Sequence, residues 1–217
     1  MQVFEDRADA GKKLAKALEQ YQGTDALVIA VPRGGVVVGY EIAAALDLKL
    51  DVVVPRKLGA PDQPELAIGA VAPWNEGNAI LDEHAISYLG VTQDYIQKET
   101  ERQLIEINRR LREYRGTIDP PNISGRTVIV VDDGIATGYT IEAALHSLRK
   151  LNPGRIILAV PVAAPDSLWR ISRLVDEVHV LMTPTPFFAV GSWYIEFGQT
   201  SDEEVIELLN ARRMQKA

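Results

Sequence analysis

The sequence predicts an α/β protein built on a doubly wound parallel sheet. Short runs of β-branched and apolar residues, typical of strands buried on both faces, recur along the 217 residues. Segments of helical length separate most of these runs, so that strands and helices alternate. The gaps are long enough for the crossovers that parallel strands require. In such a sheet, ligands bind at the carboxyl ends of the strands.

The expected elements follow in a regular order. They are an amphipathic helix over 5–20, a strand over 26–31, a helix over 36–46, a strand over 50–55, a strand over 128–131 followed by a helix that opens at Ile141, and strands over 155–160 and 177–181. The sequence Pro-Arg-Gly-Gly at 32–35 ends the first strand. The strand–loop–helix–strand spacing of the first part is that of a βαβ crossover.

Residues 56–125 depart from this rhythm, because they separate two strands by far more than one helix requires. The run from Glu65 to Leu81 contains a turn signal and indicates an antiparallel hairpin, and residues 92–114 indicate a charged helix. That helix carries one apolar stripe, formed by Leu104, Ile107, Leu111 and Tyr114. The stripe either packs on the chain's own domain or meets its mate in a homodimer.

The C-terminal region from residue 184 is rich in aromatic side chains. These are Phe187, Phe188, Trp193, Tyr194 and Phe197. A closing helix follows, with Ser201 and Glu204 in the spacing of a capping box. We therefore expect one domain over 1–217, with a flexible-loop and helical insertion at 56–125 and a C-terminal hood segment at 184–217.

The composition excludes several classes of function. A net charge of −7 argues against a surface that coats nucleic acid, and the absence of cysteine excludes disulfides, thiolate metal sites and a cysteine nucleophile. Acids stand at the N-terminus where a signal peptide is basic, and no apolar run has the length of a membrane span. These features favour a cytoplasmic enzyme or binding protein that engages neither nucleic acid nor membrane.

The segment from Val128 to Thr140 carries the most chemical information. A buried strand leads into Asp132-Asp133, and a short loop with two glycines and two threonines leads into a helix. Hydroxyls, backbone amides and a helix N-terminus suit a phosphate monoester. The two carboxylates can accept hydrogen bonds from vicinal hydroxyls or help to hold a hard cation. Together they fit a ribose 5-phosphate, whereas either feature alone is more often a solvated strand end or a turn.

This segment resembles the phosphoribosyl pyrophosphate (PRPP) signature of the type I phosphoribosyltransferases. The order Pro-Arg-Gly-Gly, Arg-Lys-Leu-Gly-Ala-Pro, the signature, and Val-Gly-Ser-Trp-Tyr resembles uncharacterised bacterial predicted phosphoribosyltransferases over nearly the full length. The resemblance implies that family's doubly wound fold and a Mg²⁺-dependent transferase of the glycosyltransferase class, acting in nucleotide salvage. Such an enzyme transfers phosphoribose from PRPP to a purine-like nitrogenous base and releases pyrophosphate. The alternatives are a PRPP-binding regulatory protein without transferase activity and a hydrolase or other enzyme acting on a phosphosugar.

The resemblance also implies roles for individual residues. Asp132 and Asp133 would act in catalysis, hold the ribose diol and bind Mg²⁺. The 5-phosphate would be bound by Ala136, Thr137, Gly138, Tyr139 and Thr140. The pyrophosphate would be bound by Arg33, Gly34, Gly35, Arg56 and Lys57, with Arg33 and Lys57 also catalytic and Arg56-Lys57 on a mobile loop. Family members often have a cis peptide in the pyrophosphate loop, so we expect one at Pro32–Arg33.

The acceptor site is the least defined part of this prediction. Trp193 and Tyr194 would give a stacking face for a base, or they belong to a small aromatic core. Ala136 stands where members acting on 6-oxopurines carry a third aspartate, so the group that manages the proton of the base is unassigned. Asp62 and Glu65 are candidates by position. The identity of the acceptor and the oligomeric state stay open.

Overall fold

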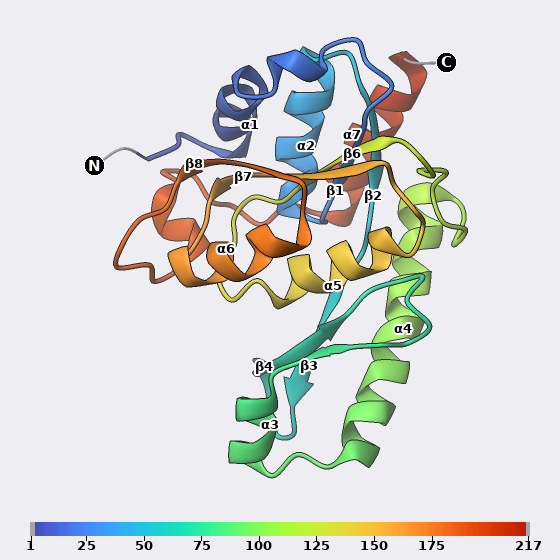
Figure 1. The fold of residues 1–217 in the computed structure, drawn as a ribbon, viewed down its shortest axis with the longest axis vertical. Helices are drawn as coiled ribbons and strands as arrows, with labels where there is room; N and C mark the ends of the chain where they lie inside the picture. The colour runs from blue at the N-terminus through green and yellow to red at the C-terminus, as the bar shows by residue number, and fades with distance from the viewer. Residues whose placement is uncertain (1–2, 216–217) are drawn as a thin grey trace.

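Five parallel strands form the central sheet, in the order β2-β1-β6-β7-β8 (Figure 1). The computed structural model describes residues 3–215. The strands are β1 Leu27–Ala30, β2 Lys49–Val52, β6 Thr127–Val131, β7 Arg155–Val162 and β8 Glu177–Met182. The chain builds outward from β1 to β2 and, in the other direction, from β6 to β8. The direction therefore reverses between β1 and β6, and this reversal is the topological switch point of a doubly wound sheet.

Helices cover both faces of the sheet (Figure 1). Those of the body are α1 Arg7–Lys16, α2 Gly34–Ala45, α5 Tyr139–Arg149, α6 Pro165–Ile171 and α7 Asp202–Gln215, with short 3₁₀ turns at Glu19–Tyr21, Ser172–Leu174 and Val190–Trp193. One apolar cluster joins α1, α2 and α7 to the sheet, and a second joins α5 to the opposite face. The predicted layer architecture is confirmed, as is the cap on α7, where the amide of Glu204 donates to Ser201 Oγ at 3.1 Å.

The insertion forms an extension that projects from this body (Figure 1). It consists of the strands β3 Arg56–Ala60, β4 Gln63–Val71 and β5 Ile80–Leu81 and the helices α3 Glu83–Leu89 and α4 Gln93–Arg115. The three strands form an antiparallel sheet, which confirms the hairpin predicted between 65 and 81 and adds β3 to it. Arg56 and Lys57, for which the resemblance implies a mobile loop, lie in β3 and pair with β4.

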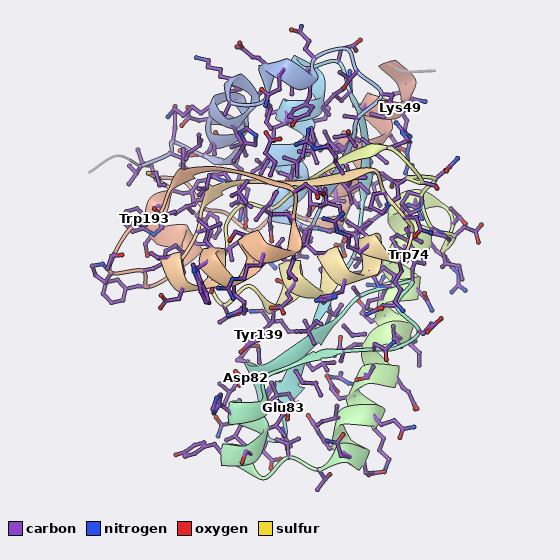
Figure 2. The ribbon with its side chains drawn as sticks, viewed as in Figure 1. Lys49, Trp74, Asp82, Glu83, Tyr139 and Trp193 are labelled. Atoms are coloured by element: carbon purple, nitrogen blue, oxygen red, sulfur yellow. The ribbon has the colours of Figure 1, made fainter. Side chains whose placement is uncertain are left out.

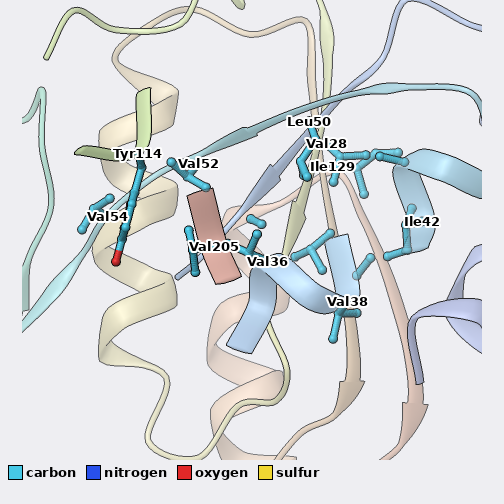
Figure 3. Packing of buried hydrophobic residues seen from close by; sticks show 14 of the residues in the cluster. Val28, Val36, Val38, Ile42, Leu50, Val52, Val54, Tyr114, Ile129 and Val205 are labelled. Atoms are coloured by element: carbon cyan, nitrogen blue, oxygen red, sulfur yellow. The ribbon is translucent and has the colours of Figure 1, made fainter. Parts of the chain in front are cut away.

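The apolar stripe of α4 packs on the chain's own body. Ile107 and Leu111 are fully buried and Tyr114 is 1% exposed. Figure 3 shows Tyr114 beside Val205 of α7, in a cluster that includes Val52 of β2. Burying each such side chain contributes roughly 1.5–3 kcal/mol, which ties the long helix to the domain. Of the two readings that the sequence allowed, the structure supports packing within the chain.

Candidate functional site

The loop after β1 and the acid pair after β6 are in direct contact at the switch point. A Cβ added to Gly34 would lie 2.8 Å from Asp133 Cγ, and one added to Gly35 would lie 2.9 Å from Asp132 Cα. Real Cβ atoms essentially never approach a heavy atom this closely, so a larger residue would have to displace Asp133 and Arg7 at position 34 or Asp132 at position 35. The peptide bond Pro32–Arg33 is cis, as predicted. The two segments that the sequence singled out therefore form one surface.

Arg7 of α1 is the counter-ion of this acid pair. Its Nε donates to Asp133 Oδ2 at 2.8 Å, with the two side chains 12% and 17% exposed. Its Nη1 donates to the carbonyl of Gly198 at 2.7 Å, and its guanidinium lies 3.9 Å from the ring centroid of Phe197. Tyr194 Oη donates to the backbone carbonyl of Asp133 at 2.5 Å. The N-terminal helix and the C-terminal hood segment thus converge on Asp133, the helix at its carboxylate and the hood segment at its backbone carbonyl.

The two carboxylates stand in an environment that disfavours their charge. Burial, reinforced by the neighbouring Asp133, raises the pKa of Asp132 well above its usual value. Burial also raises the pKa of Asp133, and the nearby Arg7 guanidinium opposes that shift. Two crowded carboxylates of this kind gain from a bound cation or from hydroxyl donors. The electrostatics of the site therefore favour a ligand that brings positive charge or hydrogen-bond donors.

A Mg²⁺ ion fits these residues when a ligand shares it. Among residues 3–215, no group of three or more acidic, histidine or cysteine side chains is arranged to hold a metal alone. Mg²⁺ is commonly bound through one or two carboxylates together with substrate phosphates. Asp132 and Asp133 supply the two carboxylates, and Asp133 also pairs with Arg7.

The loop from 134 to 138 leads into an open helix N-terminus. Gly138 has the left-handed φ of 80° that glycine tolerates, and no side chain caps α5. Ala136 and Thr137 are exposed, while Ser167 Oγ donates to the carbonyl of Ala136 at 2.6 Å and fixes the loop from behind. The amides of the first turn of α5 are therefore available to an anion.

A cationic cavity adjoins both loops. It has a volume of about 360 Å³ and extends from Pro32 and Thr140 to β3 and the flank of α4. Its charged lining comprises Arg56, Lys57, Arg102, Arg110, Glu65 and Glu99. Arg56 is held in place by its Nε, which donates to Gln103 Oε1 at 2.6 Å. Arg102 pairs with Glu99 and Arg110 with Glu106, so Arg56 and Lys57 are the lining cations that suit an anionic group.

Tyr139 joins the signature loop to the extension. Figure 2 shows its side chain pointing from α5 toward Asp82, and its Oη donates to Asp82 Oδ2 at 2.7 Å. Burial and this carboxylate raise the pKa of Tyr139 to about 12, so the hydroxyl remains a donor at neutral pH. Asp82 in turn caps α3 by accepting from the amide of Ala85 at 2.9 Å. The contact couples the position of the insertion to the start of α5.

Trp193 and Tyr194 lie in a small core, which was one of the two readings open from the sequence. Each is 6% exposed, and they cluster with Phe4 and Val162. A base stacks on an open ring face, which neither side chain presents. In contrast, Phe188 is 84% exposed. The two candidate proton acceptors lie in different places. Asp62 occupies the exposed turn between β3 and β4, whereas Glu65 lines the cavity.

Several residues of this site could not be found from the sequence. Arg7 is separated from Asp133 by 126 positions, and no local motif marks it. In the sequence, nothing distinguishes Arg102, Gln103 and Arg110 from the other polar residues of the charged helix predicted over 92–114. The fold brings them to the cavity because α4 runs alongside β3.

The sheet order and the loops at its switch point define an α/β protein of the kind that binds nucleotides and phosphosugars. The sequence model of the family described as Phosphoribosyl transferase domain matches residues 4–191. The chain therefore belongs to the phosphoribosyl transferase family, a family of enzymes, as the signature predicted. No helix within residues 3–215 combines the length and apolar character needed to cross a membrane.

Comparison with individual proteins agrees with this assignment. The chain is 42% identical over 210 residues to a provisionally named phosphoribosyl transferase of Mycobacterium tuberculosis, an alignment that covers 97% of this chain and 47% of that protein. The chain thus spans about half the length of the curated relatives it matches first. It is 41% identical to a protein of Thermus thermophilus of known crystal structure, with a TM-score of 0.77 and coverage of 96% of this chain and 98% of the other. A uracil phosphoribosyltransferase of Aquifex aeolicus is 34% identical over 62 residues, 29% of this chain and 30% of that protein.

Proposed function

We propose that the chain binds PRPP with Mg²⁺ and transfers its phosphoribosyl group to a purine-like nitrogenous base, with release of pyrophosphate. The observation that carries this proposal is the contact of Gly34 and Gly35 with Asp132 and Asp133. It joins a loop suited to pyrophosphate and an acid pair suited to a ribose diol into one surface. The start of α5, suited to a phosphate monoester, follows the acid pair by six residues.

On this proposal, each end of PRPP has its own partners. The loop at 136–140 and the first amides of α5 bind the 5-phosphate, which holds the ribose still. The Asp132 and Asp133 carboxylates accept hydrogen bonds from the ribose hydroxyls. The loop at 33–35 and the cationic cavity with Arg56 and Lys57 receive the pyrophosphate.

The reaction is a displacement at the anomeric carbon of the ribose. The bond from this carbon to the pyrophosphate oxygen breaks, pyrophosphate leaves with the electron pair, and a bond to a nitrogen of the base forms. When bound, Mg²⁺ would neutralise the charge that grows on the leaving group. The carboxylates of Asp132 and Asp133 would stabilise the positive charge that develops on the ribosyl centre. Of the two candidates to accept the proton of the base, Glu65 lines the cavity and Asp62 does not.

The test supplies PRPP, Mg²⁺ and a panel of purine and pyrimidine bases and measures released pyrophosphate. We expect turnover with at least one base, and a loss of about 100-fold or more in kcat/KM for Asp132→Asn. The matched control is Asp94→Asn, which removes a carboxylate on the exposed start of α4 that is 74% exposed. PRPP binding without turnover for any base would contradict the transferase and support the PRPP-binding regulatory protein instead.

A further inference from the structure

A second charged cavity lies at the opposite edge of the sheet from the proposed PRPP site. Its volume is about 380 Å³, within the usual range for small-ligand sites. It is lined by Leu27 and Lys49, the first residues of β1 and β2, by the loop 120–122, and by side chains from the ends of α4 and α7. Figure 2 shows Lys49 at the end of the body away from Tyr139. Because this is the amino edge of the parallel strands, the cavity is separate from the loops at the carboxyl edge.

This cavity concentrates positive charge in an acidic protein. Its lining contains five cations, which are Lys49, Arg115, Arg126, Arg212 and Arg213, and a single carboxylate, Asp51. The chain as a whole carries a net charge of −7. Five cations beside one carboxylate form a local concentration of positive charge, since charges of either sign otherwise tend to be interspersed on a surface.

Ion pairs neutralise two of the five cations, which form part of the cavity wall, and leave the other three unneutralised. Arg115 pairs with Asp51 at 2.8 Å and Arg212 with Asp47 at 3.0 Å, and both arginine side chains are under 10% exposed. Within residues 3–215, no carboxylate lies within ion-pair distance of Lys49, Arg126 or Arg213. Arg126 donates to the backbone carbonyl of Asp25, a neutral group, so its positive charge still contributes to the cavity. Lys49 and Arg213 are exposed, and their donors can reach a ligand.

Apart from Asn122, the remaining walls are apolar. Leu27 and Leu50 are 6% and 5% exposed, and Pro120 and Pro121 stand near them in the lining. A cavity with apolar walls and unneutralised cations is complementary to a ligand with a flat or apolar body and a phosphate group. We propose that this cavity is a binding site for a phosphorylated small molecule of mononucleotide size, distinct from the PRPP site.

Two helices connect the cavity with the proposed PRPP site. The last residue of α4, Arg115, lines the distal cavity, while Arg110, little more than one turn earlier, lines the cationic cavity beside Thr140. At the other end of α7 from Arg212, Asp202 accepts from Tyr114 Oη and lies 3.8 Å from Arg33 Nη1. A ligand held at the distal cavity therefore contacts the same two helices that flank the pyrophosphate loop.

The test uses adenosine 5′-diphosphate as the probe on the full chain. Affinity is measured by calorimetry for the wild type, for Lys49→Glu/Arg213→Glu, for the neutral pair Lys49→Gln/Arg213→Gln, and for the control Lys12→Glu/Lys16→Glu. The control reverses two exposed charges on α1, which packs over β7 and β8 rather than β1 and β2. Hydrogen exchange of the same samples locates the probe, since the proposed PRPP site could also bind a nucleotide.

We expect the probe to protect residues 115–126 and 205–213 from exchange. Its affinity for the distal cavity should fall about tenfold or more in Lys49→Glu/Arg213→Glu. The neutral pair should lose less, and the control should stay within about twofold of the wild type, because α1 packs over β7 and β8 whereas the cavity is lined by β1 and β2. Protection confined to residues 132–142, or equal affinity in all four proteins, would overturn the proposal. Binding of a short RNA with loss in the reversed pair, but none of the mononucleotide, would also overturn it.

Discussion

Replacing Gly34 with alanine tests the contact between the two loops. Gly34 is the first residue of α2, where helix propensity alone favours alanine over glycine by about 1 kcal/mol. The structure predicts the opposite result. The new Cβ would lie 2.5 Å from Arg7 Nε and 2.8 Å from Asp133 Cγ, and closer still to the carboxylate oxygen between them. The substitution therefore acts on the ion pair itself.

The size of the effect follows from the required movement. Ordinary van der Waals contact begins at 3.4 Å. Arg7 Nε, at 2.5 Å, must therefore move by about 0.9 Å, and Asp133 Cγ, at 2.8 Å, by about 0.6 Å. Overpacking of this kind costs about 1–3 kcal/mol, and loss of a partly buried ion pair adds to it. After the gain in propensity, Gly34→Ala should destabilise the protein by about 1–3 kcal/mol. Because Asp133 is displaced, the affinity of the Gly34→Ala protein for PRPP should fall about tenfold or more.

Gly198→Ala is the matched control for this variant. An added Cβ at Gly198 has no heavy atom within 4 Å, and the backbone there does not need a left-handed conformation. Urea unfolding gives the change in stability, and calorimetry with PRPP and Mg²⁺ gives the change in affinity. A Gly34→Ala protein that is at least as stable as the wild type, and binds PRPP equally well, would refute the reasoning.

Three further predictions follow from charged groups. Burial and Asp133 raise the pKa of Asp132, so its contribution to stability is lost as the pH rises from the ordinary pKa of an aspartate through the raised folded pKa. Asp132→Asn should therefore raise the Tm at neutral pH while weakening PRPP binding, and an unchanged or lower Tm would contradict this. Hydrogen bonds from two arginines one turn along α4 lower the pKa of Glu106 to about 2. The stability that this carboxylate contributes is therefore present above pH 4.5 and is lost as the pH falls toward 2. In urea titrations, Glu106→Gln should cost about 1 kcal/mol of stability at pH 6, after allowance for solvent screening, and nothing near pH 2. Lys57→Ala should lower kcat/KM for PRPP about tenfold, whereas Lys98→Ala on the outer face of α4 should leave it unchanged; equal effects would count against a role for Lys57.

The strands and helices of the body could be predicted because their signals are local. Four β-branched residues at 128–131 and the apolar run at 26–31 mark buried strands, and each lies within one or two residues of its predicted place. The cis bond at Pro32–Arg33 was predicted from the family resemblance and is present. The strand β3 was missed because its pairing with β4 is irregular, with register shifts at Leu58–Gly59 and Gly59–Ala60 that interrupt the alternation of side chains.

Site residues that depend on contacts between distant parts of the chain could not be predicted from the sequence. Nothing near Arg7 in the sequence indicates that it pairs with Asp133, since that contact depends on how α1 and the hood segment pack over the sheet. Trp193 and Tyr194 could be read either as a base platform or as core, because an aromatic cluster has the same appearance in sequence in both cases. Burial decides between the two, and burial is a property of the folded chain.

The most direct test of the proposed site is a calorimetric titration of PRPP into the chain, with and without Mg²⁺, repeated for Thr137→Ala/Thr140→Ala. The account predicts PRPP binding that is weaker without Mg²⁺ and is weakened about tenfold or more by removal of the two hydroxyls that flank the start of α5. Absence of any PRPP binding by the wild type in the presence of Mg²⁺ would contradict it.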